Sequence, residues 1–239
     1  MTLRNVSVTL VGPEFPVNVG HAARLVKNFG VRKLYLIEPN FDRRVASVYA
    51  AHASEVIEEA EEIGFDELRR RHDLLVATTA VTAVRRANVN RLAVTPEEAA
   101  RYVSSARAAS LVFGRDTTGL RNEELARCDI ATTLTTGTSY RTLNVSHSIA
   151  VMLYVLSRSK ASGQPLPRTG ERDAFAAHAY RLAVAAGVQE YRAVKLRRLA
   201  SRMALRSQLD GKDLGLLISL MRKAAEAIPE RASQARSKT

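Results

Sequence analysis

The sequence contains few aromatic residues and only one cysteine. Tryptophan is absent, and Phe, Trp and Tyr together make up 5% of the 239 residues. A stacking platform for single-stranded nucleic acid is therefore not the obvious binding mode. The single cysteine, Cys128, excludes an internal disulfide, which fits a reducing compartment. We accordingly expect a cytoplasmic protein.

Long apolar runs and metal-ligand patterns are also lacking. No run approaches the roughly 20 apolar residues that a membrane span needs. The first residues, MTLRNVSVTLVG, already form a strand pattern and show no secretory signal. The five histidines are scattered and cysteine pairs are absent, so no metal-site spacing is found. We expect no metal and no membrane contact.

Positive charge is abundant and unevenly distributed. The formal net charge is +12 and the sequence pI is about 10.3, which favours a polyanionic partner. Residues 161–239 carry 15 Lys and Arg against 7 Asp and Glu, whereas residues 1–160 carry 21 against 17. Most of the excess therefore lies in the last third of the chain.

Apolar runs alternate with helical periodicity over the first two thirds of the chain. This alternation predicts an α/β fold with a mainly parallel sheet. The expected strands are Val6–Val11, Leu34–Ile37, Asp73–Thr78, Ala109–Phe113 and Ile130–Leu134. The expected helices are Val19–Phe29, Ser47–Ile63, Glu97–Ser104 and Ser146–Ser159.

A linker separates this region from a purely helical one. Residues 161–172 combine Gly, Pro, Ser and charged residues without periodicity. We therefore divide the chain into a first domain, 1–160, a linker, 161–172, and a small all-α domain, 173–239. The expected helices of the latter are 173–186, 190–207 and 213–227, followed by a frayed tail over 229–239.

The stretch from Leu111 to His147 organises the first domain. Its two expected strands each end in a loop of small and hydroxyl residues, 114–119 and 135–142. Open α/β sheets bind ligands at the carboxyl ends of strands, and small residues let the main chain approach a ligand closely. The stretch therefore predicts a pocket that holds a small cofactor mainly with main chain.

Three short motifs around this pocket each allow a structural and a functional interpretation. Asn18 either caps the following helix or faces the strand-end loops with Arg24. The loop 114–120 is neither a P-loop nor a GxGxxG fingerprint, so Asp116 either orients a ligand or anchors a turn. In the third motif, Asn144 or Ser146 either caps a helix or contributes to the site.

The densest basic segment is 191–206. At about 100° per residue, Lys195, Arg198, Arg202 and Arg206 share one stripe of a helix. This stripe lies beside an apolar one formed by Leu196, Leu199 and Met203. A solvated basic face is the common interpretation, but the charge of this region favours contact with an RNA or DNA backbone.

Taken in order, the three motifs are similar to those of a known enzyme family. Asn-x-Gly-x-x-x-Arg (18–24), Phe-Gly-Arg-Asp-x-x-Gly-Leu (113–120) and Thr-Leu-Asn-Val-Ser (142–146) resemble the SPOUT RNA methyltransferases, in particular the TrmH/TrmJ branch of ribose 2′-O-methyltransferases. The resemblance covers residues 5–159. The basic segment from residue 195 to 223 is similar to the helical tail of TrmJ, which points to transfer RNA.

The resemblance implies a fold, a cofactor and an assembly. The second loop would thread through the first to form a C-terminal trefoil knot in the first domain. S-adenosyl-L-methionine (AdoMet) would bind at the last loops. The enzyme would be a homodimer that modifies the ribose of nucleotide 32 in the tRNA anticodon loop. The implied AdoMet contacts are Thr78, Thr79, Gly114, Asp116, Gly119, Leu134, Thr136, Leu143 and Asn144.

The resemblance also implies catalytic and RNA-binding roles. Arg24 would face the AdoMet of the other subunit, and Asn18, Asn144 and Ser146 would position the ribose. Because a guanidinium normally stays protonated, either the nearby sulfonium and burial let Arg24 accept a proton, or Arg24 holds a phosphate and polarises the hydroxyl. The second role is favoured here. Predicted RNA contacts are Arg85, Arg86, Arg115, Lys195, Arg198 and Arg202.

Two departures and two alternatives remain at this point. Family members commonly have Glu where this chain has Asp116, and its shorter side chain is expected to shift the loop or weaken a contact. They also often have Arg directly after the third strand, a role that Arg85 and Arg86 would fill here. The alternatives to a tRNA enzyme are an rRNA 2′-O-methyltransferase and a non-catalytic RNA-binding protein on the same fold.

Overall fold

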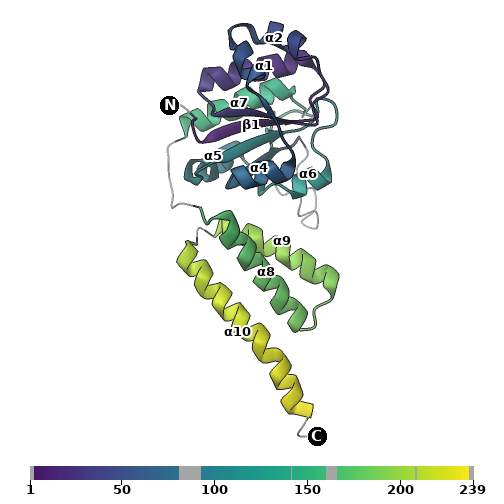
Figure 1. The fold of residues 1–239 in the computed structure, drawn as a ribbon, viewed down its shortest axis with the longest axis vertical. Helices are drawn as coiled ribbons and strands as arrows, with labels where there is room; N and C mark the ends of the chain where they lie inside the picture. The colour runs from purple at the N-terminus through teal and green to yellow at the C-terminus, as the bar shows by residue number, and fades with distance from the viewer. Residues whose placement is uncertain (1–2, 81–92, 141, 160–165, 208, 237–239) are drawn as a thin grey trace. The chain divides into compact units, whose positions relative to one another are not determined.

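The computed structural model describes residues 3–80, 93–140, 142–159, 166–207 and 209–236 (Figure 1). The chain divides into two compact units, 1–163 and 164–239. The first unit combines strands and helices, and the second consists of helices. Among the described residues, no helix combines the length and apolar character that a membrane crossing requires.

A seven-stranded sheet forms the centre of the first unit. Its order is β3-β2-β1-β6-β4-β7-β5, and every described strand pairing is parallel. The strands are β1 (Val6–Val11), β2 (Lys33–Ile37), β3 (Glu61–Glu62), β4 (Leu74–Thr78), β5 (Ala93–Val94), β6 (Ala109–Phe113) and β7 (Ile130–Thr132). The predicted parallel α/β sheet is confirmed.

Burial on both faces explains why these strands are mainly apolar and lack a regular alternation of apolar and charged residues. Every residue of β1 and of β6 is buried, as expected for parallel strands covered by helices. Figure 1 shows α1 (Pro16–Phe29), α2 (Arg43–Ala50) and α7 (Val145–Arg158) on one face of the sheet. The helix α5 (Pro96–Ser105) packs against α7, whereas α4 (Phe65–Arg71) and α6 (Asn122–Ala126) share one buried cluster on the other face.

The segment expected to form one helix over 47–63 is divided into shorter elements. The helix α2 starts earlier, at Arg43, because the Asp42 carboxylate accepts hydrogen bonds from the Arg44 and Val45 backbone N–H groups. It ends at Ala50, because the next residue, Ala51, has a φ of 49° in the left-handed region. A 3₁₀ turn (Ala51–Ala53), α3 (Ser54–Glu58) and the edge strand β3 follow.

The strand order places a switch point between β1 and β6. The chain runs from β1 outward to β2 and β3, then crosses back to β4, β6 and β7 on the other side of β1. Loops at the carboxyl ends of strands diverge at such a point and leave room for a ligand. The fold therefore brings the ends of β1, β4, β6 and β7 to one edge of the first unit.

The second unit consists of α8 (Thr169–Ala185), α9 (Glu190–Arg206) and α10 (Gly211–Arg236). Its helices meet through small side chains, with Ala176, Ala179 and Ala200 in one buried cluster that also contacts Phe175 and Met221. The expected linker is shorter at its end, since α8 begins at Thr169. The tail expected to fray instead continues α10 to Arg236.

The interior face of α9 is formed mainly by alanines and not by its larger apolar stripe. Alanines are buried here, whereas Leu196, Leu199 and Met203 are 39%, 45% and 55% exposed. Small side chains allow helix backbones to approach closely, which explains why the alanine face is chosen for packing. The larger apolar stripe consequently lies at the surface beside the basic one.

Candidate functional site

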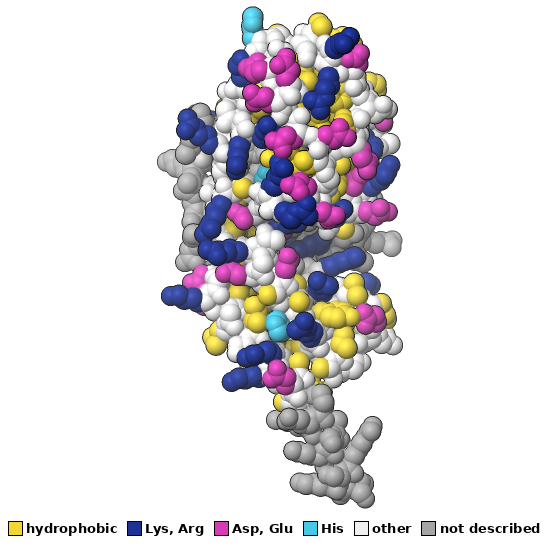
Figure 2. All heavy atoms as spheres, in the orientation of Figure 1, with side chains coloured by type: hydrophobic (Ala, Val, Ile, Leu, Met, Phe, Trp, Pro, Cys, Tyr) yellow, Lys and Arg dark blue, Asp and Glu magenta, His cyan; other side chains and the backbone are white. Residues whose placement is uncertain are grey.

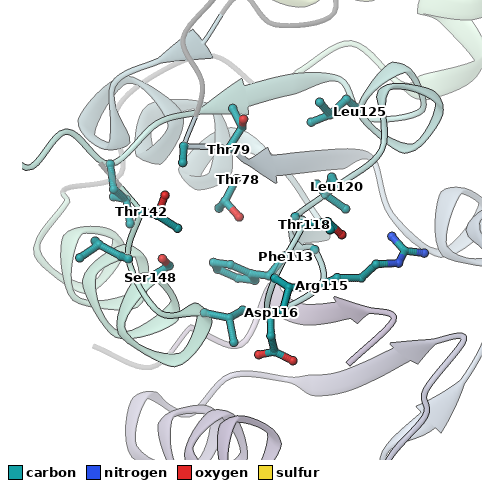
Figure 3. A pocket seen from close by; sticks show the side chains of 17 residues that line it. Thr78, Thr79, Phe113, Arg115, Asp116, Thr118, Leu120, Leu125, Thr142 and Ser148 are labelled. Atoms are coloured by element: carbon teal, nitrogen blue, oxygen red, sulfur yellow. The ribbon is translucent and has the colours of Figure 1, made fainter. Parts of the chain in front are cut away.

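A cavity of about 290 Å³ lies at the carboxyl ends of β4, β6 and β7 (Figure 3). This volume is close to the lower end, roughly 300 Å³, of small-molecule pockets. The cavity is lined by residues 78–80 after β4, by residues 113–120 after β6, and by Leu134, Thr142, Leu143 and Val145 between the end of β7 and the start of α7, together with Leu125 and Ser148. It is the strand-end pocket that the sequence predicts.

The loop after β6 is a tight turn closed by its own main chain. Arg115 N–H donates to the Gly119 carbonyl at 3.2 Å, and Gly119 N–H donates to the Arg115 carbonyl at 3.0 Å. Gly119 has a φ of +69°, and a Cβ on Gly114 would lie 2.2 Å from the Gly119 carbonyl carbon. Both positions therefore require glycine, and the compact loop keeps its backbone close to the cavity.

A chain of side-chain hydrogen bonds joins the three motifs. Asn18 Nδ2 donates to Asp116 Oδ1, and Asn144 Nδ2 donates to Asn18 Oδ1 at 3.1 Å. Asn144 Oδ1 in turn accepts from the Ser146 backbone N–H at 2.8 Å and from the Ser146 hydroxyl at 2.7 Å. Residues 98 and 126 positions apart in sequence are thus connected beside the pocket.

These bonds decide between the alternatives that the sequence leaves open. Asn18 is not a helix cap, because α1 begins at Pro16 and the Asn18 side chain is directed at Asp116 and Asn144. Asn144 is the N-cap of α7 and contacts Asn18 as well. Ser146 is 4% exposed, and its hydroxyl orients Asn144.

Asp116 anchors the loop to the start of α1. Its Oδ2 accepts from the Glu14 and Phe15 backbone N–H groups at 3.3 and 3.4 Å. Figure 3 shows its carboxylate pointing out of the cavity, toward the N-terminal part of the chain. The aspartate side chain is therefore long enough to hold this loop, and the second oxygen complements the positive end of the helix.

Arg115, predicted to contact RNA, has protein partners instead. Its Nη1 donates to both Glu124 carboxylate oxygens at 3.0 and 3.1 Å, and its Nη2 donates to Glu38 at 3.3 Å. Its side chain is only 11% exposed, and a Cβ on Gly12 would lie 2.8 Å from its Nε. Such a bidentate, buried pair leaves little of the guanidinium for a phosphate.

Arg24 lies on the exposed face of α1 and is not among the residues that line the cavity. Arg85 and Arg86 lie outside the described residues. Thr136 lines a neighbouring cavity with the start of α5 and the side chains of Val151 and Val155. The structure thus gathers seven of the nine implied AdoMet contacts in one cavity, and places Thr136 and Asn144 beside it.

The remaining predicted RNA contacts lie on α9. Lys195 and Arg198 are exposed, and Arg202 is partly buried. Burial, together with the charges of Arg206 and Arg198, lowers the pKa of Arg202. The mutual effect of these arginines indicates a concentrated positive potential along this helix.

The sequence interpretation did not single out several lining residues. Phe113, Leu120, Leu125, Thr142 and Ser148 also face the cavity, and Figure 3 shows Phe113 near its centre. Phe113 and Leu120 were visible as the ends of a motif, and Thr142 began another. Leu125 and Ser148 come from helices, so only the tertiary structure brings them here.

The lining combines apolar walls with hydroxyl groups. Phe113, Leu134 and Leu143 offer contacts for a flat apolar group, whereas Thr78 and Thr142 carry hydrogen-bonding hydroxyls. Gly119 has open space around its Cβ position. Among the described residues, no group of three His, Cys, Asp or Glu side chains is arranged to hold a metal ion. This composition fits a nucleoside-like ligand that the main chain also grips.

A model of the SpoU rRNA methylase family matches residues 5–154. The chain belongs to this family. The predicted resemblance to SPOUT methyltransferases of the TrmJ type is thereby confirmed. The methyl donor of the family is AdoMet.

Individual relatives extend the similarity to both units. A tRNA (cytidine-2′-O-)-methyltransferase TrmJ from Methanocaldococcus jannaschii is 35% identical over 65% of this chain and 68% of its own. A tRNA (cytidine/uridine-2′-O-)-methyltransferase TrmJ from Shigella dysenteriae is 26% identical over 92% of this chain and 95% of its own. The crystal structure of TrmJ from Z. mobilis has the same fold, with a TM-score of 0.67, 21% identity, and coverage of 91% and 97%.

Proposed function

We propose that this SpoU-family protein transfers a methyl group from AdoMet to a ribose 2′-hydroxyl of tRNA, at nucleotide 32 of the anticodon loop. The observation that carries the proposal is the cavity at the ends of β4, β6 and β7, which gathers most of the implied AdoMet contacts. The names of the TrmJ relatives support tRNA as substrate and the 2′-hydroxyl as acceptor.

AdoMet supplies an activated methyl group on a sulfonium. The apolar side chains of Phe113, Leu134 and Leu143 would hold its adenine, while the hydroxyls of Thr78 and Thr79 and the main chain of 114–119 would bind its polar atoms. The Asp116–Asn18–Asn144 chain would keep the two loops in register around it. Methyl transfer is an in-line displacement, so this alignment is the principal contribution of the protein.

The acceptor side requires a residue from outside the cavity. Arg24 is exposed on α1, where its guanidinium can hold an RNA phosphate and polarise the ribose hydroxyl. Asn144 is exposed and anchored by Asn18 and Ser146, which suits it to orient the ribose. We therefore assign phosphate binding to Arg24 rather than proton abstraction.

We also propose a homodimer in which Arg24 serves the site of the partner subunit. Phe15, Val48 and Tyr49 expose apolar surface at the start of α1 and on α2, with Val48 77% exposed. Exposed apolar side chains grouped on two helices that pack against each other are typical of protein interfaces. Val48→Asp is expected to yield monomers in analytical ultracentrifugation and to lower methyl transfer. A fully dimeric and active variant would place the interface elsewhere.

The knot is part of the same proposal. Leu134, Thr142 and Leu143 line one cavity with the loop 113–120, although β4 lies between β6 and β7 in the sheet. If the segment between β7 and α7 threads through the loop that follows β6, this proximity is explained. The resemblance to the SPOUT family, to which the matching SpoU model belongs, implies the same threading.

The helical unit would supply tRNA affinity. The Shigella relative is similar over nearly the whole chain, including this unit. The unit carries most of the excess positive charge, and exposed Lys195 and Arg198 are available for phosphates. Phosphate contacts of this kind predict binding that weakens steeply with salt.

The decisive experiment measures methyl incorporation from labelled AdoMet into tRNA and maps the modified nucleotide. The full chain is expected to methylate the 2′-hydroxyl at position 32. Arg24→Lys should lose most turnover and keep AdoMet binding, because an ammonium cannot reproduce the guanidinium fork. Arg32→Lys, the same exchange at an exposed position away from the cavity, is the control. Wild-type turnover of Arg24→Lys would refute the guanidinium role.

Ribosomal RNA is the second candidate substrate, because the matching family is described as one of rRNA methylases. Parallel incorporation assays with tRNA and rRNA separate the two. A non-catalytic RNA-binding protein on the same fold would bind RNA and incorporate no methyl group. Thermal stabilisation by AdoMet, expected for a ligand of the folded state, distinguishes that case independently of the RNA.

A further inference from the structure

One aromatic residue of the helical unit combines high exposure with two adjacent cations. Tyr191 lies in the first turn of α9 and is 54% exposed. The Arg192 guanidinium carbon and the Lys195 ammonium each lie 5.6 Å from its ring centroid. Arg192 Nε also donates to the Tyr191 hydroxyl oxygen at 2.9 Å. The ring is therefore oriented by its neighbours while much of it stays open to solvent.

Packing within the unit does not account for this position. The buried residues of α9 are Ala193, Ala200, Ala204 and Leu205, and Tyr191 is not among them. The nearest acidic residue in the chain, Glu190, accepts a hydrogen bond from the Tyr180 hydroxyl of α8. Its carboxylate is thus directed to α8, whereas Tyr191 is accompanied by positive charge.

The surface around Tyr191 is basic and partly apolar. Val194 and Leu196, which follow Tyr191 on α9, are 38% and 39% exposed. One face of the helical unit likewise shows hydrophobic side chains among Lys and Arg (Figure 2). Arg197 and Arg198 are exposed one to two turns further along α9. Double-stranded RNA offers phosphates to such a surface but no free base face. An unpaired nucleotide offers both.

We propose that Tyr191 stacks on an unpaired base of the RNA substrate, with Arg192 and Lys195 at the adjoining phosphates. The proposal rests on the proposed function in taking RNA as the ligand, and it adds the class of RNA element that the helical unit recognises. Every base has a π-face, so an exposed ring binds unpaired bases with little sequence preference. The flanking cations add electrostatic attraction and hold the ring in position.

The test compares two RNAs with the full-length protein. One is a hairpin with an unpaired loop, and the other is a fully paired duplex of the same stem. Fluorescence anisotropy gives the dissociation constant of each at several salt concentrations. Tyr191→Ala is expected to weaken hairpin binding by about 5- to 150-fold, the range for loss of one stacked base. Duplex binding should change by less than about twofold, since no base is free to stack.

Three further variants test whether the loss of hairpin affinity is caused by loss of the aromatic ring. Tyr191→Phe keeps the ring and should bind the hairpin like the wild type. Lys195→Gln removes one charge and should weaken the binding of both RNAs. It should also lower the slope of the logarithm of the binding constant against the logarithm of salt concentration by about one. Leu199→Ala truncates another exposed side chain of α9 and should leave both affinities unchanged. Far-UV circular dichroism verifies that each variant keeps its helices.

Several outcomes would overturn the proposal. They are unchanged hairpin binding by Tyr191→Ala, an equal loss on hairpin and duplex, and a loss with Tyr191→Phe as large as with Tyr191→Ala. Failure of the proposed function is recognised separately, because it is measured as absence of methyl transfer to tRNA by the wild type. If the protein binds the hairpin through Tyr191 but transfers no methyl group, the stacking role of Tyr191 is supported and the proposed enzymatic function is refuted.

Discussion

At the scale of single residues, the hydrogen-bonded chain from Asp116 to Ser146 has the greatest consequence for the site. Asn18 is 6% exposed and is the only link in that chain that both donates to a carboxylate and accepts from an amide. An amide suits this position because it has a donor and an acceptor on one side chain. The residue therefore connects the loop after β6 to the start of α7.

Asn18→Asp is expected to disrupt this connection. The new carboxylate would face Asp116 at hydrogen-bonding range, and repulsion would separate the loops that line the cavity. We expect AdoMet affinity to fall by about tenfold or more, a loss of about 1.4 kcal/mol, as measured by isothermal titration calorimetry. Asn28→Asp, at an exposed position of the same helix, should bind AdoMet normally. Equal affinities of the two variants would contradict the role of Asn18.

A second residue-scale prediction concerns acid stability and His72. This side chain is 6% exposed; its Nδ1 lies 2.9 Å from the Leu68 carbonyl and its Nε2 2.8 Å from the Ser7 hydroxyl. The carbonyl can only accept, so Nδ1 carries the proton of a neutral ring and Nε2 accepts from Ser7. Burial lowers the pKa of His72 below 6.5.

The lowered pKa means that the unfolded chain binds more protons than the folded one just below pH 6.5. The free energy of unfolding should therefore fall as the pH drops through about 6.5 and toward the lower folded-state pKa. Urea denaturation from about pH 8 to about pH 5 measures this decline. His72→Gln should flatten it, and His52→Gln at an exposed position should not. An unchanged slope in His72→Gln would show that other groups dominate.

At the scale of elements, the close contact of α1 with α2 depends on Gly20. A Cβ on Gly20 would lie 2.5 Å from Tyr49 Cβ and 2.6 Å from the Ala46 carbonyl oxygen. The glycine of the first motif thus has a packing role, since only glycine permits this approach. Because α1 also contributes Asn18, the contact with α2 helps to position the site.

Gly20→Ala should consequently destabilise the protein. Forcing a methyl group into this contact is expected to lower the free energy of unfolding by about 1–3 kcal/mol. Gly215→Ala is the matched control, because Gly215 lies in α10 with open space around its Cβ position. There the exchange should be neutral or raise stability by up to about 1 kcal/mol. Urea denaturation measures the free energy of unfolding of both variants. A stabilised Gly20→Ala variant would refute the packing role of Gly20.

At the scale of the whole molecule, the two compact units suggest a division of labour. The cavity belongs to the unit 1–163, and the basic helix α9 belongs to the unit 164–239. The affinity for a ligand that contacts only one unit should not change when the other unit is removed. RNA affinity that depends on phosphates of a long substrate should depend on both.

A chain ending at residue 163 tests this division. We expect AdoMet affinity within about twofold of the full chain, since every residue that lines the cavity is retained. tRNA binding should weaken, and the salt slope should decrease by about one for each phosphate that α9 no longer neutralises. Calorimetry with AdoMet and anisotropy with tRNA provide the two readouts. Equal tRNA affinity of both chains would contradict a role for the helical unit.

The sequence by itself determined the local features of this protein. Mainly apolar runs such as Val6–Val11 and Ala109–Phe113 matched β1 and β6, because parallel strands buried on both faces are rich in apolar residues. The glycines at 114 and 119 marked a tight strand-end loop, because few other residues adopt such a backbone. Strands and tight turns depend on residues close together in the sequence, so a local pattern is sufficient to predict them.

Only the tertiary structure decided which distant groups meet. It directed Arg115 to Glu124 and Glu38 instead of outward, and it joined Asn18 to Asp116 and Asn144 across 98 and 126 positions. It also chose the alanine face of α9 for packing and left the leucines exposed. Periodicity reports that a helix has two faces. Which face is buried depends on the shape of the partner helix, and no local pattern contains that shape.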